Sequence, residues 1–262
     1  CALARCLLEA GADPNDGQAL YNTMFTPGDR CLELLLEFGL GPDAMCNWLI
    51  GPPDDLRPNT QRTLEYQLLW AASKHHTARA RLLLQHGADA SAVMNGKSVW
   101  KLARLSGHTA ILADLTRHGA REEPLRDTEA FAAACMAGDQ AEAARLHHRD
   151  PALIERAQVE MPSLLADAAG LDRRDAVRCL VAMGWDINAM TGGNSALHQA
   201  AWNGFREMAL LLIELGADAL RCDRAHDATP ADWAAYNGHA DVARAIRAHS
   251  DDDDAQGSNA SN

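Results

Sequence analysis

Short runs of apolar residues recur along the chain with the spacing of an amphipathic helix, and most of these runs end at a glycine. Leucine-rich runs precede six such glycines: Gly11, Gly39, Gly87, Gly119, Gly184 and Gly216. The third and fourth glycines are 32 residues apart, and so are the last two. The 65 residues between the fourth and fifth make two such steps, with Asp150 between them. A fixed period of this length predicts a stack of helical repeats.

Two further columns keep the register when they are counted back from the closing glycine. The residue sixteen positions earlier is small: Thr23, Ala71, Ala103, Ala134, Ala168, Ala200 and, counted from Ser250, Ala234. The residue nineteen positions earlier is large and apolar in every unit but the last: Leu20, Leu68, Trp100, Phe131, Leu165, Leu197 and then Ala231. The pattern therefore predicts two short antiparallel helices in each unit, and the apolar stripe of one unit can be buried only by its neighbours.

Residues of known capping preference mark the ends of these helices. The first helix begins after a hydroxyl side chain that can accept from the free amides of its first turn: Ser98, Ser163, Ser195 or Thr229. The second helix ends at the glycine, which we expect to take the left-handed conformation. The unit at 127–150 is the weakest, because Asp150 replaces the glycine and Leu146-His147-His148-Arg149 replaces the leucine run.

Several motifs resemble the ankyrin repeat. Gly216-Ala217-Asp218 matches that family's G-A-D, residues 195–201 (S-A-L-H-Q-A-A) match its T-P-L-H-x-A-A, and Asn237-Gly238-His239 matches its x-G-H turn. The resemblance implies an all-α, ankyrin-like solenoid of about seven helix pairs, preceded by a partial N-terminal repeat. We expect it to span residues 1–250, with an inserted loop at 45–60, and to be followed by a disordered acidic and polar tail at 251–262.

Charge and composition restrict the partners. The formal net charge of the 262 residues is −12, of which Asp251–Asp254 supply four charges. A solenoid of this sign is repelled by phosphate backbones, so we expect no nucleic-acid partner. No segment approaches the ~20 apolar residues of a membrane span. The seven cysteines include no C-x-x-C pair, and Cys6, Cys31 and Cys179 fall on apolar helix columns. We therefore expect a monomeric, cytoplasmic protein with these thiols buried.

Candidate catalytic and metal-binding groups are better explained as structural residues. Ser195 and His198 have the spacing of a nucleophile and a base, but in the resembling family these positions hold a helix cap and its hydrogen-bonding partner. The pairs His75-His76 and His147-His148 diverge by about 100° on a helix, so neither can hold a metal ion alone. We expect a non-catalytic protein without cofactor or metal.

The inserted loop is the first candidate interaction site. It contains Trp48-Leu49-Ile50, an apolar cluster that has no repeat column to occupy, and three prolines that preclude a regular helix. Two interpretations remain open. Trp48 either folds back onto a neighbouring repeat or contacts a partner, since long loops in compact repeats often carry function.

The second candidate is a column two residues after the small one. Its members are Phe25, Ser73, Leu105, Met136, Gly170, Trp202 and Tyr236. In ankyrin-like stacks this position faces the concave groove, and aromatic residues and methionine are typical of interfaces. We expect Phe25, Leu105, Met136, Trp202 and Tyr236 to line one concave face, with Trp48 near its N-terminal end; partial burial against the adjacent hairpin is the alternative. Trp70, Leu102 and Trp233 are assigned to the core instead.

These observations favour a module that binds another protein through its concave face. An alternative is that the chain is the interaction arm of a larger enzyme or effector whose catalytic domain lies upstream of Cys1. Binding of a small ligand in the groove is a third possibility, although no charged groups visibly converge on a pocket.

Overall fold

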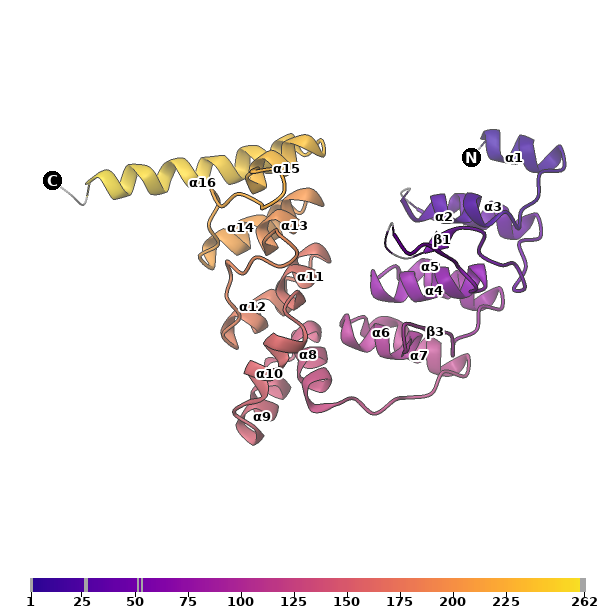
Figure 1. Cartoon of the computed structure of the whole chain (residues 1–262), viewed down its shortest axis with the longest axis horizontal. Helices are drawn as coiled ribbons and strands as arrows, with labels where there is room; N and C mark the ends of the chain where they lie inside the picture. The colour runs from indigo at the N-terminus through magenta and orange to yellow at the C-terminus, as the bar shows by residue number, and fades with distance from the viewer. Residues whose placement is uncertain (1, 26–27, 51, 53, 260–262) are drawn as a thin grey trace. The chain divides into compact units, whose positions relative to one another are not determined.

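The computed structural model describes residues 2–25, 28–50, 52 and 54–259, and in this part it consists mainly of helices, with two small β-hairpins (Figure 1). The chain divides into two compact units, unit 1 (Cys1–Pro124) and unit 2 (Leu125–Asn262). The described helices include the seven predicted antiparallel pairs and, before them, the second helix of a partial repeat. Whether residues 1–250 form one continuous solenoid stays a prediction.

Unit 1 contains the partial repeat, three helix pairs and both hairpins. Its elements are α1 (Ala2–Glu9), α2 (Gly17–Asn22), the 3₁₀ turn η1 (Thr23–Phe25), α3 (Arg30–Glu37), β1 (Leu49–Ile50), β2 (Arg57–Pro58), α4 (Thr63–Ser73), α5 (Thr77–Gln85), β3 (Val93–Met94), β4 (Lys97–Ser98), α6 (Val99–Leu105) and α7 (Thr109–Arg117). Strands β1 and β2 pair antiparallel, as do β3 and β4.

Unit 2 contains four helix pairs and one additional helix. Its elements are α8 (Asp127–Ala137), α9 (Gln140–Arg149), α10 (Leu153–Glu160), α11 (Leu164–Gly170), α12 (Arg174–Ala182), α13 (Ala196–Trp202), α14 (Arg206–Glu214), α15 (Pro230–Tyr236) and α16 (Ala240–Asn259). The first helices of successive repeats pack side by side, α11 on α13 and α13 on α15. Their second helices form a parallel row, because α12 packs on α14 and α14 on α16.

The two sequence columns are buried as their register requires. Ala200 is fully buried on α13, between the two first helices that flank it, which confirms the small column. Phe131 and Leu197 of the large column belong to the unit 2 core. Gly216 has φ +98° and thus takes the predicted left-handed conformation. The hydroxyl caps are confirmed at Ser98, Ser195 and Thr229, whose side chains accept from the amides of Lys101, His198 and Asp232, respectively.

The weakest unit of the sequence departs from the pattern. Asp150 has φ −141°, so α9 ends in extended backbone rather than in a left-handed turn. The chain then forms α10, a helix that the repeat register does not predict, and its Leu153 and Ala157 are buried in the core against α8. Ser163 is not a cap of the expected kind, because its hydroxyl donates to the Asp167 carboxylate instead of accepting from a backbone amide.

The inserted loop at 45–60 is a β-hairpin. Its strands are held by the β1–β2 pairing and by hydrogen bonds from the Cys46 amide to the Gln61 carbonyl and from the Asn59 amide to the Trp48 carbonyl. The Trp48 ring lies 5.1 Å from the rings of Tyr21 and Tyr66, measured between centroids. Trp48 therefore folds back onto the neighbouring repeats of unit 1, as one of the two interpretations predicts.

Two further predictions concern the C-terminal segment and the burial of three cysteines. The backbone continues as helix α16 to Asn259, whereas the sequence predicts disorder from residue 251; residues 260–262 lie outside the described part. Because nothing else tests it, the disordered tail stays a prediction. Cys31 is half-buried and Cys179 buried, but Cys6 is exposed on α1, where the expectation of burial is wrong.

Candidate functional site

A pocket of about 790 Å³ opens on unit 2 between the ends of α13 and α15. We call it the aromatic pocket; its lining residues are Gln199, Trp202, His226, Ala228, Asp232, Trp233 and Tyr236. Trp202 is the last residue of α13 and Tyr236 the last residue of α15. The repeat places them at equivalent positions of neighbouring helices, so their side chains lie next to each other.

Three aromatic rings line the pocket: Trp202 and Tyr236 form two walls, and Trp233 forms the base. The rings of Trp202 and Tyr236 are nearly parallel, with an interplanar angle of 23° and centroids 6.2 Å apart. The Trp233 ring stands at 73° to Trp202, with a centroid distance of 5.6 Å. The side chains are exposed to different degrees: Tyr236 is 86% exposed, Trp202 is 39% exposed and Trp233 is half-buried. Exposed aromatic surface of this extent is unusual outside binding sites.

The loop before α15 places a buried carboxylate beside Trp233. Asp223 in this loop is 4% exposed, and its carboxylate accepts hydrogen bonds from the backbone amides of Ala225, His226 and Ala228 at 2.9–3.1 Å. Burial raises the pKa of Asp223, but the hydrogen bonds from these amides and the nearby Trp233 indole lower it by more, so the pKa lies well below its ordinary range. An ionised carboxylate thus lies beside the indole at the base of the pocket.

Behind the pocket, His198 connects two repeats. Its Nδ1 accepts from the Ser195 amide at 3.2 Å, and its Nε2–H donates to the Ala228 carbonyl at 3.1 Å. Burial lowers the pKa of His198, which keeps the imidazole neutral. Both ring nitrogens are engaged in holding the cap of α13 and the loop before α15. The geometry thus supports the structural interpretation of the Ser195–His198 pair.

Asp232 supplies the carboxylate on the pocket lining. Its Oδ2 accepts from the Thr229 hydroxyl at 2.7 Å, and its Oδ1 pairs with the Arg247 guanidinium at 2.9 Å. Hydrogen bonds from the Thr229 hydroxyl and amide are the main cause of the lowered pKa of Asp232, and the Arg247 guanidinium lowers this pKa further. The carboxylate is half-exposed, with 52% of its side chain accessible.

The other predicted interface residues lie elsewhere. Leu105 is half-buried at the end of α6, and Trp48 is half-buried in the hairpin; both belong to unit 1. Met136 is only 1% exposed, so the expectation that it is exposed is wrong. It lies in the unit 2 core because α10 and α12 both pack on α8. The side chain of Phe25 lies outside what the structure describes.

Trp233 is a pocket residue that the sequence analysis assigned to the core. It is three positions before Tyr236, in the column of Trp70 and Leu102, and all three side chains are half-buried. A spacing of three residues on a helix places two side chains on adjoining parts of one face. The aromatic pair at 233 and 236 was therefore a usable signal that this face continues into the pocket.

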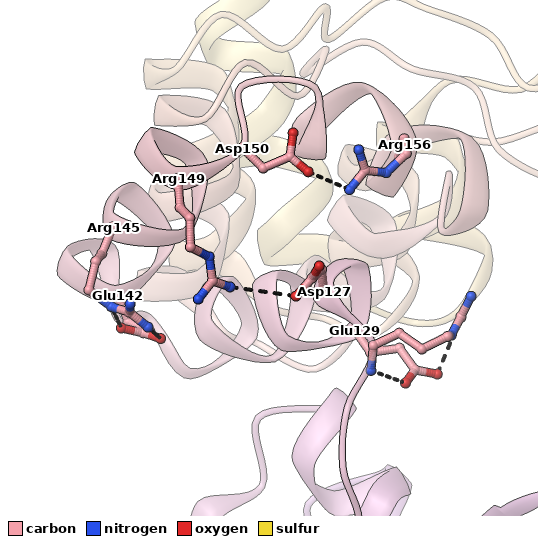
Figure 2. Close-up of polar contacts among 8 residues, drawn as sticks. Asp127, Glu129, Glu142, Arg145, Arg149, Asp150 and Arg156 are labelled. Carbon is pink, nitrogen blue, oxygen red and sulfur yellow. Dashed lines mark hydrogen bonds and ion pairs between the residues drawn. The ribbon is translucent and has the colours of Figure 1, made fainter.

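Charged residues also cluster at the start of unit 2, but they pair with one another (Figure 2). Arg149 reaches Asp127 at 3.5 Å, and Arg156 reaches Asp150 at 2.7 Å. Arg145 binds Glu142, and Glu129 accepts from both the backbone amide and the guanidinium of Arg126. Apart from the pair of the buried Glu129, these are surface ion pairs of small energetic value, and they do not indicate a ligand. Among the described residues, no group of three or more His, Cys, Asp or Glu side chains could hold a metal ion.

The architecture defines the class of protein: an all-α helical-repeat solenoid whose loops and first helices form the exposed site. The sequence model of the ankyrin repeats, in three copies, matches residues 131–223, from within α8 to the loop that carries Asp223. Residues 131–223 thus contain ankyrin repeats, and the resemblance found in the motifs of this segment is confirmed. No curated protein matches it significantly in sequence. None of the helices in the described part is long and apolar enough to cross a membrane.

Proposed function

We propose that this chain binds a partner protein and that the aromatic pocket is the centre of the contact surface. Ankyrin repeats are in general protein–protein interaction modules and typically non-catalytic. The observation that carries the proposal is the exposure of Trp202 and Tyr236 over a pocket of about 790 Å³. Tryptophan and tyrosine are the residues that most often dominate binding energy at interfaces, above all where they line a pocket.

Two residues of unit 1 are separate candidates for partner contact. Leu105 and Trp48 are half-buried and keep accessible apolar surface, so unit 1 by itself can also contact a partner. We further propose a monomeric, cytoplasmic module with no chemistry of its own. We also propose that it has no nucleic-acid partner, because the net charge of −12 opposes binding to phosphate backbones. The pocket would serve in the same way if the module were the interaction arm of a larger enzyme or effector.

The test compares two matched double variants of the full chain. Trp202→Ala with Tyr236→Ala removes two walls of the pocket, whereas Val159→Ala with Leu220→Ala removes apolar side chains of unit 2 that are 82% and 57% exposed and lie outside it. In a pull-down from the source cell, we expect the first variant to lose partners that the second retains. Loss of about 2 kcal/mol or more of binding energy would reduce capture more than twentyfold.

Thermal stability separates a binding role from a core role. The Trp202 ring contacts the rings of Tyr236 and Trp233, and these contacts lie at the surface, so removal of the two side chains should cost only about 1 kcal/mol of folding free energy. A fall in melting temperature much larger than this, with capture intact per folded molecule, would contradict the proposal and show that the pocket is part of the core.

A further inference from the structure

Equivalent tryptophans of the two units have different neighbours. Trp70 on α4 and Trp233 on α15 occupy the same column of their repeats. Over the Trp70 ring lies the guanidinium of Arg79, 5.3 Å from the ring centroid, and Arg79 is only 3% exposed. Arg79 is nine residues after Trp70. The residue nine positions after Trp233 is Val242, which is buried. Unit 1 therefore places a cation over this ring, whereas unit 2 has an apolar side chain at the corresponding position.

The same contrast extends to the other rings. Arg5 lies over Phe38 and Arg104 over Trp100, both in unit 1. In the part of the chain that the structure describes, no arginine or lysine lies over the rings of Trp202, Trp233 or Tyr236. These rings nevertheless have the properties that attract a cation, because their π faces are negative and border an open pocket.

Charge near the pocket has the matching sign. Asp223 lies beside the Trp233 indole, and Asp232 places a second carboxylate on the lining, where Thr229 and Arg247 also bind it. Unit 2 contains 12 basic and 22 acidic residues, a formal net charge of −10 out of the −12 of the whole chain. A cation that approaches this pocket is attracted by the unit as well as by the rings.

We propose that the aromatic pocket binds the guanidinium of an arginine on an exposed segment of the partner protein. The inference rests on the proposed function and specifies its partner. A guanidinium is planar, so it can lie flat on the face of Trp202 or Tyr236. The N–H groups at its edge can then donate to the Gln199 amide oxygen and share the half-exposed Asp232 carboxylate with Arg247. A quaternary ammonium has no N–H to donate and depends on enclosure by rings, which the 86% exposed Tyr236 does not provide. The lining thus favours arginine.

The experiment uses the full chain and one short probe, the peptide acetyl-Gly-Ser-Ala-Arg-Ala-Ser-Gly-amide. Its matched control carries citrulline, which has nearly the shape of arginine but no charge, and a second control carries lysine. Binding is followed by NMR through the indole N–H signals of Trp202 and Trp233, assigned with single Trp→Phe variants. We expect saturable shifts of both signals with the arginine peptide, and about tenfold weaker binding of the citrulline peptide.

Each outcome decides the inference. Shifts that depend on arginine and are absent when Trp202→Ala is combined with Tyr236→Ala support it. Citrulline binding as tight as arginine binding overturns it, as does tighter binding of the lysine peptide or the absence of any shift up to about 10 mM peptide. None of these failures removes the proposed function, because the pull-down with the pocket variant tests that separately: a pocket that captures a partner without preferring arginine would fail here and succeed there.

Discussion

Two left-handed glycines of unit 2 differ in one respect that a pair of alanine substitutions can measure. Gly138 closes α8 with φ +76°, and Gly216 follows α14 with φ +98°. A Cβ added at Gly216 would meet nothing within 4 Å, whereas a Cβ at Gly138 would lie 2.7 Å from the Cβ of Asp175 on α12. Gly216→Ala therefore adds backbone strain alone, and Gly138→Ala adds strain together with a steric overlap.

The magnitudes follow from these two terms. An L-residue in the left-handed conformation costs roughly 1–2 kcal/mol, part of which is offset by the lower entropy of the unfolded alanine chain, so Gly216→Ala should cost about 1 kcal/mol. Optimal carbon contacts are about 3.5–4.0 Å, so α8 and α12 must separate by about 1 Å to accept the Cβ of Gly138→Ala. Overpacking of this kind adds about 1–3 kcal/mol, for a total of about 2–4 kcal/mol.

Urea unfolding followed by the helical circular dichroism signal measures both free energies, provided that the slope of the transition is the same in the two variants. Hydrogen exchange of the α8 and α12 amides then shows whether the loss at Gly138→Ala is local. Equal losses in the two variants would refute the steric argument and mean that α8 and α12 are not held at this distance. A neutral Gly216→Ala would refute the argument from backbone strain.

Two further predictions concern the register and the pocket loop. Ala200→Leu should overfill the fully buried contact of α13 with its neighbours and cost about 1–3 kcal/mol, measured as the change in the urea midpoint; a neutral substitution would mean that the small column is not a close contact. Because the folded-state pKa of Asp223 lies below the unfolded value of about 3.9, its contribution to stability is present above that pH and lost as the pH falls through the folded pKa. Asp223→Asn should therefore destabilise the protein at neutral pH and reduce the loss of stability below about pH 4. An unchanged acid limb in denaturation from pH 7 to about pH 2 would show that the Asp223 carboxylate does not titrate in this way.

The sequence pattern predicts the repeats because the residues that specify one repeat lie close together in the chain. A helix pair is specified by apolar residues at helical spacing, by a hydroxyl cap such as Thr229 and by a closing glycine such as Gly216, all within about 33 residues. The same rules did not predict α10. Its residues Leu153 and Ala157 form a helix because α8 offers them an apolar surface, and that surface is a property of the packed unit.

The candidate interface shows the same division. The column rule assigned one position to the groove in every repeat, and the structure exposes it at Trp202 and Tyr236 but buries it at Met136. What differs is the set of neighbours: α10 and α12 pack on α8, whereas the ends of α13 and α15 face an open pocket. Exposure depends on which elements pack against a residue, and the pattern of a single repeat does not contain this information.

The sequence by itself determined the helical-repeat class, the period, the left-handed closing glycine and the small contact column, because each follows from backbone geometry and from side-chain size at fixed spacing. The tertiary structure alone decided that Trp48 folds onto Tyr21 and Tyr66, and that Trp233 joins Trp202 and Tyr236 around a pocket. These contacts join residues up to 34 positions apart. Whether such residues meet depends on how whole repeats stack and on the hydrogen bonds of loops such as 223–228.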